Sequence, residues 1–235
     1  MEIKIENLVK KYGENTVVDI PQLTIDKGEL IGLVGNNGAG KTTLMRLMLD
    51  LIAPTQGYIE SNGKRVDQDE QWKQYTGSFI DGRFLIDFYT PEEYFAFIAR
   101  TYGIDGDMLK KRLEMYSSLM HDEILGTKKY LRQFSEGNRQ KIGIIGAMIV
   151  NPQVLVLDEP FNYLDPTSQI TVARLIKQLN QLMDATVVIS SHNLNFVSEI
   201  STRILLLEKG HVIKDLDNEN DNVTAELENY FQTAN

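Results

Sequence analysis

The sequence predicts an α/β fold with a mixed sheet, an antiparallel β region at the N-terminus and a helical region inserted between strands. Continuous apolar runs at 30–34, 154–157 and 186–189 are typical of buried strands in a parallel sheet that is covered on both faces. Short segments within 1–26 alternate apolar and charged residues instead, as half-buried strands do. From Asp81 onward, about seventy residues show helical spacing, which predicts a separate helical lobe.

Composition restricts the class of protein. With 235 residues, of which 42% are hydrophobic, the chain is long enough for one domain with a substantial core. The absence of cysteine excludes disulfides and thiolate metal sites. The 24 Lys and Arg against 33 Asp and Glu give a net charge of −9, which argues against a nucleic-acid partner. No apolar run approaches the roughly 18–20 residues that span a bilayer, and the N-terminus does not resemble a signal peptide, so we expect a cytoplasmic protein.

A glycine-rich stretch follows the first apolar run. Residues 35–43 read G-N-N-G-A-G-K-T-T and match the phosphate-loop pattern. A turn of this kind between strand and helix directs backbone N–H groups at one point, where the helix N-terminus adds partial positive charge. A turn without a ligand is the alternative, and the strand–loop–helix context argues against it. We expect Lys41 to reach the phosphates and the Thr42 hydroxyl to bind Mg²⁺. The candidate nucleotide-binding residues are Gly35, Asn36, Asn37, Gly38, Ala39, Gly40, Lys41, Thr42 and Thr43.

Weaker signals lie on either side of this loop. Tyr12 stands in a turn between two alternating segments, where an aromatic ring can stack on a purine base, although a tyrosine in a turn more often serves packing. After the loop, Asn62 and Gly63 between two short β-like segments predict a hairpin, and 76–80 predicts a further strand.

Helix starts stand out in the helical region. Thr90 and Glu93 form a capping box, with Pro91 in the first turn. A second helix is expected near 107–119. Ser135 suits the N-cap of a later helix. A glycine beside that helix N-terminus is a potential phosphate site, but an ordinary capped helix explains the same residues.

Two carboxylates follow the second apolar run. Asp158 and Glu159 stand at the carboxyl end of 154–157, where α/β sheets bind ligands. Asp158 can hold the Mg²⁺ that Thr42 binds, and Glu159, if not coordinated, can accept a proton from an attacking water. A solvated pair at a strand end is the alternative, and the phosphate loop makes it less favoured.

The last third of the chain continues the alternation of helix and strand. Asp165 caps a long helix whose apolar residues are expected on one face: Ile170, Leu175, Ile176, Leu179 and Leu182. His192 follows 186–189 and could contact a γ-phosphate, although a lone histidine is usually a surface or packing residue. A β pair at 203–208 and 211–214 precedes an acidic tail. A short terminal amphipathic helix, expected to pack on the body, carries Val223, Leu227, Tyr230 and Phe231.

The set of motifs resembles the ATP-binding cassette (ABC) family, the nucleotide-binding subunits of ABC transporters. The matching segments, in the family's order, are Tyr12 (adenine-stacking aromatic), 35–43 (Walker A), 134–138 (signature motif), 154–159 (Walker B and catalytic glutamate), 162–165 (D-loop) and His192 (switch histidine). The resemblance implies a P-loop NTPase core in an ABC ATPase domain at 1–214. It also implies a helical subdomain at about 82–150 and leaves 215–235 as an acidic tail with a short helix.

The resemblance also implies a mechanism. Two cassettes pair head to tail and sandwich each ATP, so that Ser135 and Gly137 contact the nucleotide of the partner. Thr42 and Asp158 hold Mg²⁺, Glu159 polarises the attacking water, and His192 positions the γ-phosphate. A second ABC subunit, identical or related, is therefore an expected partner.

Three residues depart from the family's pattern. Asp81 stands where the family usually carries glutamine, and a carboxylate there could still bind Mg²⁺ while adding negative charge near Asp158 and Glu159. Glu136 replaces a glycine of the signature motif, and Asn138 replaces a glutamine. Ser135 and Gly137 are retained, so we expect the sandwich to form, with an altered rate of turnover.

The leading hypothesis is an ATPase subunit that powers a separate membrane permease, with exporter-like features between 88 and 103, held at the inner face of the cell membrane through that permease. A soluble ABC protein that acts on ribosomes or DNA is a second hypothesis. The single cassette, the lack of a coiled-coil insertion and the acidic charge argue against it. A regulatory ATP-binding module with weak hydrolysis is a third, suggested by Asp81 and Glu136, and intact Lys41 and Glu159 argue against it.

Overall fold

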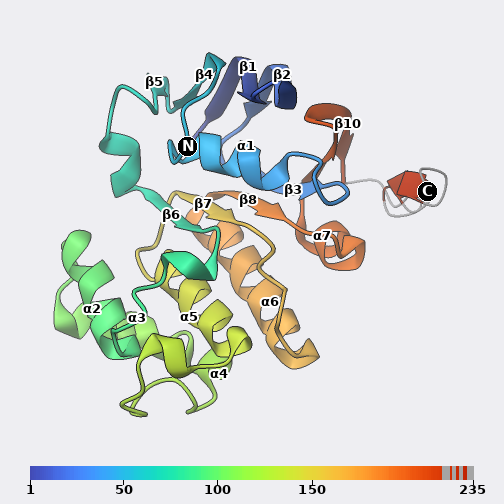
Figure 1. Ribbon diagram of the computed structural model, residues 1–235. Helices are drawn as coiled ribbons and strands as arrows, with labels where there is room; N and C mark the ends of the chain where they lie inside the picture. Colours follow the sequence, from blue (N-terminus) through green and yellow to red (C-terminus); the bar gives the residue numbers. More distant parts are fainter. Residues whose placement is uncertain (219–222, 224–225, 228–229, 232–235) are drawn as a thin grey trace.

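A six-stranded mixed sheet forms the centre of the molecule, whose computed structural model describes residues 1–218, 223, 226–227 and 230–231 (Figure 1). The strand order is β10-β9-β3-β8-β7-β6, and neighbouring strands are parallel except for β9 with β10. The carboxyl ends of β3, β7 and β8 therefore meet at one edge of the sheet. The strands are β3 (Leu30–Val34), β6 (Thr76–Phe79), β7 (Val154–Leu157), β8 (Thr186–Ser190), β9 (Arg203–Glu208) and β10 (His211–Asp217).

A smaller antiparallel sheet, with the order β2-β1-β4-β5, is built from the N-terminal segments. Its hairpin turns at Asn62 and Gly63, which have φ values of 53° and 74°, as the favoured two-residue hairpin turn requires. The predicted hairpin is confirmed. The strands are β1 (Ile3–Tyr12), β2 (Asn15–Ile25), β4 (Gln56–Ser61) and β5 (Lys64–Arg65).

Helices lie on both sides of the central sheet (Figure 1). The α-helices are α1 (Lys41–Met48), α2 (Pro91–Thr101), α3 (Gly106–Glu114), α4 (Ser117–Met120), α5 (Glu136–Met148), α6 (Pro166–Met183) and α7 (Leu194–Ile200). Short 3₁₀ helices cover Gln71–Gln74, Gly82–Phe84 and Leu131–Gln133. The predicted capping box is confirmed, because the Thr90 hydroxyl accepts from the Glu93 N–H and the Glu93 carboxylate accepts from the Thr90 N–H.

Two hydrophobic layers explain why the central strands are apolar at every position. On one face, α1 packs between the two sheets, so that Leu44 shares a cluster with Ile31 of the mixed sheet and Ile5 of the antiparallel sheet. On the other face, α5 and α6 pack against strand residues such as Leu155 and Val187. Successive residues of a strand point to opposite faces, so a sheet covered twice requires an apolar residue at each position. The predicted α/β fold with a mixed sheet, an antiparallel β region and inserted helices is confirmed.

Two expectations about helices were wrong in detail. The helix expected near 107–119 is divided into α3 and α4, with the break at Met115 and the buried Tyr116. On α6, Ile170 is 63% exposed and Leu182 is 81% exposed, instead of lying on the buried face. Ile170 stands five positions before Leu175, which places it about 140° around the helix from that buried residue. Leu182 lies in the last turn of α6.

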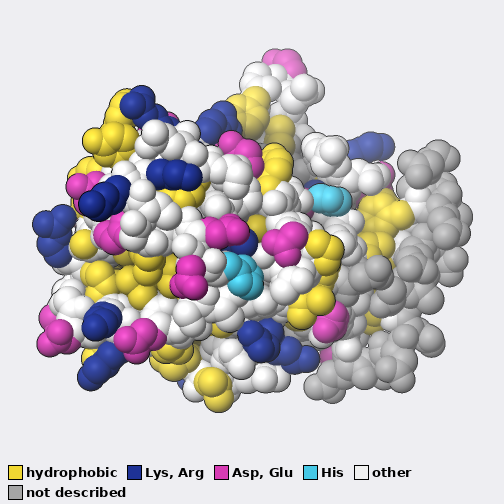
Figure 2. All heavy atoms as spheres, turned by 90° about the horizontal axis from the view of Figure 1, so that it is seen from below, with side chains coloured by type: hydrophobic (Ala, Val, Ile, Leu, Met, Phe, Trp, Pro, Cys, Tyr) yellow, Lys and Arg dark blue, Asp and Glu magenta, His cyan; other side chains and the backbone are white. Residues whose placement is uncertain are grey.

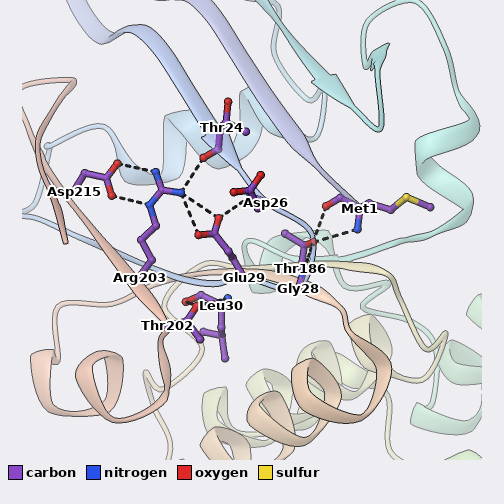
Figure 3. A network of polar contacts seen from close by, with 10 residues as sticks. All are labelled: Met1, Thr24, Asp26, Gly28, Glu29, Leu30, Thr186, Thr202, Arg203 and Asp215. Carbon is purple, nitrogen blue, oxygen red and sulfur yellow. Dashed lines mark hydrogen bonds and ion pairs between the residues drawn. The ribbon is translucent and has the colours of Figure 1, made fainter. Parts of the chain in front are cut away.

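An ion-pair network ties the two sheets together at the end opposite the carboxyl edge (Figure 3). The Arg203 guanidinium on β9 contacts Asp215 on β10 through Nε at 2.7 Å and Glu29 through Nη1 at 3.1 Å. Its Nη1 also donates to the Thr24 carbonyl of β2 at 2.9 Å. The hydrogen bond with Asp215 raises the pKa of Arg203 above its usual value, which keeps the guanidinium charged.

The described part of the C-terminal segment packs on the body. Val223 and Leu227 are buried in a cluster that includes Val34 and Leu206, and Tyr230 and Phe231 pack against the same cluster. The rest of the predicted terminal helix, at 219–222, 224–225, 228–229 and 232–235, lies outside the described residues. β10 includes 215–217, at the start of the segment assigned to the tail.

The helical lobe carries an apolar groove of about 440 Å³. Figure 2 shows hydrophobic side chains gathered on the left, where α2 and α3 lie in Figure 1. Basic and acidic side chains are interspersed over this face, so it presents no field of a single sign. The apolar residues that line the groove are Leu109, Leu113, Met120 and Leu125.

Candidate nucleotide site

The phosphate loop connects β3 to α1 at the carboxyl edge of the central sheet. Gly40 has a φ of 108°, and a Cβ atom built on it would lie 2.5 Å from the Val17 carbonyl oxygen, so only glycine fits there. Gly40 is also the N-cap of α1 and provides no side-chain cap. The first N–H groups of α1 are therefore open to an anion, as the sequence pattern predicts.

Lys41 lies inside the curve of the loop and is only 7% exposed. Its Nζ donates to the carbonyl oxygens of Gly35 at 2.6 Å and Asn36 at 3.3 Å. Burial lowers the pKa of Lys41, and the charges of Glu159 and Asp158 oppose that shift. A buried ammonium at the base of a phosphate loop is suited to bind a polyphosphate anion.

Thr42 and Asp158 meet across the edge of the sheet. The Thr42 hydroxyl donates to Asp158 Oδ2 at 2.5 Å, and the Ser190 hydroxyl donates to Asp158 Oδ1. Ser190 also accepts from the Glu159 N–H at 2.8 Å. The parallel strands β7 and β8 bring these residues together, because Leu157 is in register with Ile189 and the next residue of each strand meets at the edge.

Glu159 faces His192 at the ends of the same two strands. Glu159 Oε2 lies 2.9 Å from His192 Nδ1 and 3.3 Å from the His192 backbone nitrogen. The backbone of Glu159 is in the left-handed region, with a φ of 47°. A residue other than glycine is rarely found there, and such conformations concentrate at functional sites.

Glu159 and His192 line a cavity of about 530 Å³. The structure therefore brings 35–37 of the phosphate loop together with Glu159, the predicted general base, and with His192. Phe231 of the C-terminal segment forms part of the wall, which the sequence analysis did not anticipate. The lining residues are Gly35, Asn36, Asn37, Glu159, Asn162, Ser191, His192, Leu194 and Phe231.

Of the predicted site residues, Gly35, Asn36, Asn37, Glu159 and His192 line this cavity, whereas 38–43 and Asp158 lie beside it and are joined to it through the loop and the strand ends. As far as the structure describes the chain, Tyr12, Asp81, Ser135 and Gly137 are also outside the lining, on other elements. Tyr12 ends β1, is 52% exposed, and has the Lys10 ammonium 5.0 Å from its ring centroid. Ser135 caps α5 by accepting from the Asn138 N–H at 3.3 Å. A Cβ on Gly137 would lie 2.7 Å from the Tyr163 carbonyl oxygen, so the glycine permits the signature segment to approach 162–165 closely.

Asp81 is paired with a neighbouring arginine. Its Oδ2 accepts from Arg83 Nε at 2.8 Å, and its Oδ1 accepts from the Arg83 N–H at 2.9 Å. The hydrogen bond with Arg83 lowers the pKa of the Asp81 carboxyl, so the group stays ionised. To bind Mg²⁺, the Asp81 carboxylate would have to leave Arg83, so its role as a metal ligand stays a prediction.

Sequence reasoning missed two residues that contact Asp158 and Glu159. Ser190 links Asp158 to Glu159, and Gln140 Nε2 of α5 donates to the Glu159 carbonyl at 3.0 Å. A polar residue at the end of a fully apolar strand was the available signal for Ser190. Gln140 offered no comparable signal, because its partner lies on a different element.

The donor set fits ATP with Mg²⁺. Open N–H groups at the start of α1 and a buried lysine match a polyphosphate. A hydroxyl and a carboxylate, both hard oxygen ligands, match Mg²⁺, which usually takes one or two protein carboxylates together with phosphate oxygens. Within the described part of the chain, no group of three or more His, Cys, Asp or Glu side chains could hold a metal ion by itself.

A phosphate loop, a Thr–Asp pair and a carboxylate–histidine pair on one edge of a mixed sheet define a P-loop nucleoside triphosphatase. A family model described as ABC transporter matches residues 18–162. The bacitracin transport ATP-binding protein BcrA of Enterococcus faecalis is 33% identical over 217 residues, covering 92% of this chain and 69% of that protein. The probable sulfate/thiosulfate import ATP-binding protein CysA of Chlorella vulgaris is 33% identical over 214 residues, covering 91% of this chain and 90% of that protein.

A solved structure supports the same fold. A dimeric bacterial ABC transporter cassette has a TM-score of 0.83 at 24% identity, over 93% of this chain and 99% of that chain. The chain belongs to the ABC transporter family, as one of its ATP-binding, ATP-hydrolysing subunits. No helix among the described residues has both the length and the hydropathy of a membrane span.

Proposed function

We propose that this subunit hydrolyses ATP to power a separate membrane permease, with Glu159 as the general base and Thr42 and Asp158 as the protein ligands of Mg²⁺. The observation that carries the proposal is the placement of Glu159 and His192 beside the phosphate loop, with the two side chains 2.9 Å apart. Bound Mg²⁺ supplies charge neutralisation at the β- and γ-phosphates.

Each residue has a separate task in this proposal. Lys41 and the N–H groups that begin α1 bind the β- and γ-phosphates. Glu159 accepts a proton from the attacking water, and His192 orients the Glu159 carboxylate through its Nδ1 contact. Tyr12 stacks on the adenine ring. Asp81, once released from Arg83, adds a ligand to Mg²⁺ directly or through water.

Pairing of two cassettes completes the site. Ser135 and Gly137 lie at the N-terminus of α5, on a different element from the phosphate loop, and match the signature motif of the family, so we propose that they bind the nucleotide of a second cassette. The dimeric arrangement of the structural neighbour supports this pairing. The partner is a second copy of this chain or a related subunit.

The permease is the second partner. The apolar groove at Leu109 and Leu113 in the helical lobe offers it a contact surface. The exporter-like sequence between 88 and 103 supports export, and BcrA is named for bacitracin transport. CysA, which is as similar in sequence to this chain as BcrA is, is named for import. Uptake and efflux by the assembled transporter must therefore both be measured.

Steady-state ATP hydrolysis over a range of protein concentrations tests the proposal, with the Glu159→Gln variant alongside. We expect a specific activity that rises with concentration, because pairing completes the site, and that is lost in the variant. A turnover rate of Glu159→Gln equal to that of the wild type would show that Glu159 is not the general base. Activity independent of concentration would contradict pairing of identical chains.

A further inference from the structure

The peptide groups of Glu159 are held by two side chains from different elements and by one backbone N–H group. Its N–H donates to the Ser190 hydroxyl of β8 at 2.8 Å. Its carbonyl accepts from Gln140 Nε2 of α5 at 3.0 Å and from the Asn162 N–H at 3.2 Å. Glu159 has a left-handed φ of 47°, a conformation that residues other than glycine adopt uncommonly and that the surrounding contacts can stabilise.

Gln140 is placed to fix this conformation. It lies in the second turn of α5, is 8% exposed, and reaches from the helix to the loop after β7. A buried amide that donates to a carbonyl cannot be replaced by water without rearrangement. The helix is itself held in place, because Arg139, the preceding residue, donates to the Gly82 carbonyl at 3.0 Å and contacts Asp87 at 2.9 Å.

We propose that Gln140 is a positioning residue for ATP hydrolysis: it holds the Glu159 peptide in the left-handed conformation that directs the carboxylate toward His192. The proposal rests on the proposed function of Glu159 as the general base. The Gln140 amide contacts the Glu159 backbone carbonyl, so its effect on turnover passes through the backbone of Glu159.

A consequence follows from the position of Gln140 on α5. Ser135, the N-cap of this helix, is proposed to bind the nucleotide of a second cassette, and five residues later the same rigid helix holds Glu159. Docking of the second cassette on Ser135 therefore acts on the helix that sets the general base of this chain. In a pair of cassettes, α5 of each chain thus connects the nucleotide site that contains its Glu159 with the nucleotide site of the partner.

The test compares two glutamines that make the same kind of bond to the same loop. Gln140→Met removes the amide that donates to the Glu159 carbonyl, whereas Gln169→Met removes an amide that donates to the Phe161 carbonyl at 3.0 Å. We expect kcat to fall at least about 10-fold in Gln140→Met, because small displacements of a catalytic group cost one to two orders of magnitude. The dissociation constant of Gln140→Met for ATP should stay within about twofold of the wild-type value. The kcat of Gln169→Met should also stay within about twofold of wild type.

A double substitution separates positioning from a general loss of structure. In the Glu159→Gln background, Gln140→Met should cause no further loss of residual turnover, because a residue that acts through another is not additive with it. Three outcomes would overturn the inference. They are a full additional 10-fold loss of turnover in the double variant, a loss of kcat in Gln169→Met equal to that in Gln140→Met, and an unchanged kcat in Gln140→Met. If Gln140→Met does not fold, Gln140→Leu removes the donor without adding a charge and serves in its place.

The two proposals fail in different ways. Wild-type turnover in the single variant Glu159→Gln contradicts the proposed function itself. Loss of turnover in Glu159→Gln, together with unchanged kcat in Gln140→Met, leaves the proposed function standing and rejects only the role of Gln140.

Discussion

Thr42 and Asp158 are 116 positions apart in the sequence, and the Thr42 Oγ1 lies 2.5 Å from the Asp158 Oδ2. Thr42 lies in the first turn of the helix after β3 and Asp158 directly follows β7, so the parallel sheet brings them together. Their meeting joins the half of the site that binds phosphate to the half that holds Glu159 and His192.

Lys41→Ala should weaken ATP binding by about 10- to 100-fold, because each hydrogen bond to a charged group contributes about 1.5–3 kcal/mol. Titration calorimetry with ATP and Mg²⁺ measures the change. Lys27→Ala is a matched control, since Lys27 lies at the surface and pairs with Asp184. An ATP affinity of Lys41→Ala equal to that of the control would contradict the phosphate-loop assignment.

Glu159→Gln should bind ATP but lower kcat by about 10²- to 10⁴-fold, the usual contribution of a general base. With hydrolysis blocked, ATP should drive the chain into a stable pair that elutes earlier on size-exclusion chromatography. Addition of ADP in place of ATP is the control and should leave the elution volume unchanged. Equal elution with both nucleotides would argue against an ATP sandwich.

Asp81→Gln should preserve or raise turnover if Asp81 only replaces the usual glutamine of the family. The carboxylate is paired with Arg83, and that pairing lowers its pKa, so at neutral pH it adds a negative charge near the site. Measurement of kcat over a range of Mg²⁺ concentrations separates the two roles. A large loss of kcat that excess Mg²⁺ restores would show that Asp81 binds the metal.

Tyr116 should make the folded state sensitive to alkali. Burial raises its pKa from about 10 to about 12, so the folded protein favours the neutral phenol. The stabilisation is complete below about pH 10 and is lost as the pH rises toward about 12, with an upper limit of about 2 to 3 kcal/mol. Tyr116→Phe should therefore lose less unfolding free energy than wild type between about pH 9 and about pH 11.5 in urea titrations.

The control for this prediction is Tyr130→Phe, because Tyr130 is 43% exposed. That variant should follow the wild-type dependence on pH. If Tyr116→Phe also followed it, the burial of the phenol would not contribute to the loss of stability in alkali.

The sequence by itself determined the fold class and the phosphate-binding half of the site. Residues 35–43 form a local structure, in which glycine conformations and the first turn of a helix are set by neighbours in the chain. The capping box at Thr90 and the apolar strands are also local signals, and they were confirmed for the same reason. Asp158 and Glu159 could be placed at a strand end, because spacing alone locates the end of an apolar run.

Only the tertiary structure decided which side chains hold these groups in position. Ser190 and Gln140 contact Asp158 and Glu159 across distances of 19 to 32 residues along the chain. The exposure of Ile170 and the place of Phe231 in the cavity wall depend likewise on which element packs where. A hydrogen bond between distant elements is set by their relative placement in the packed core, and no periodicity in the sequence encodes that placement.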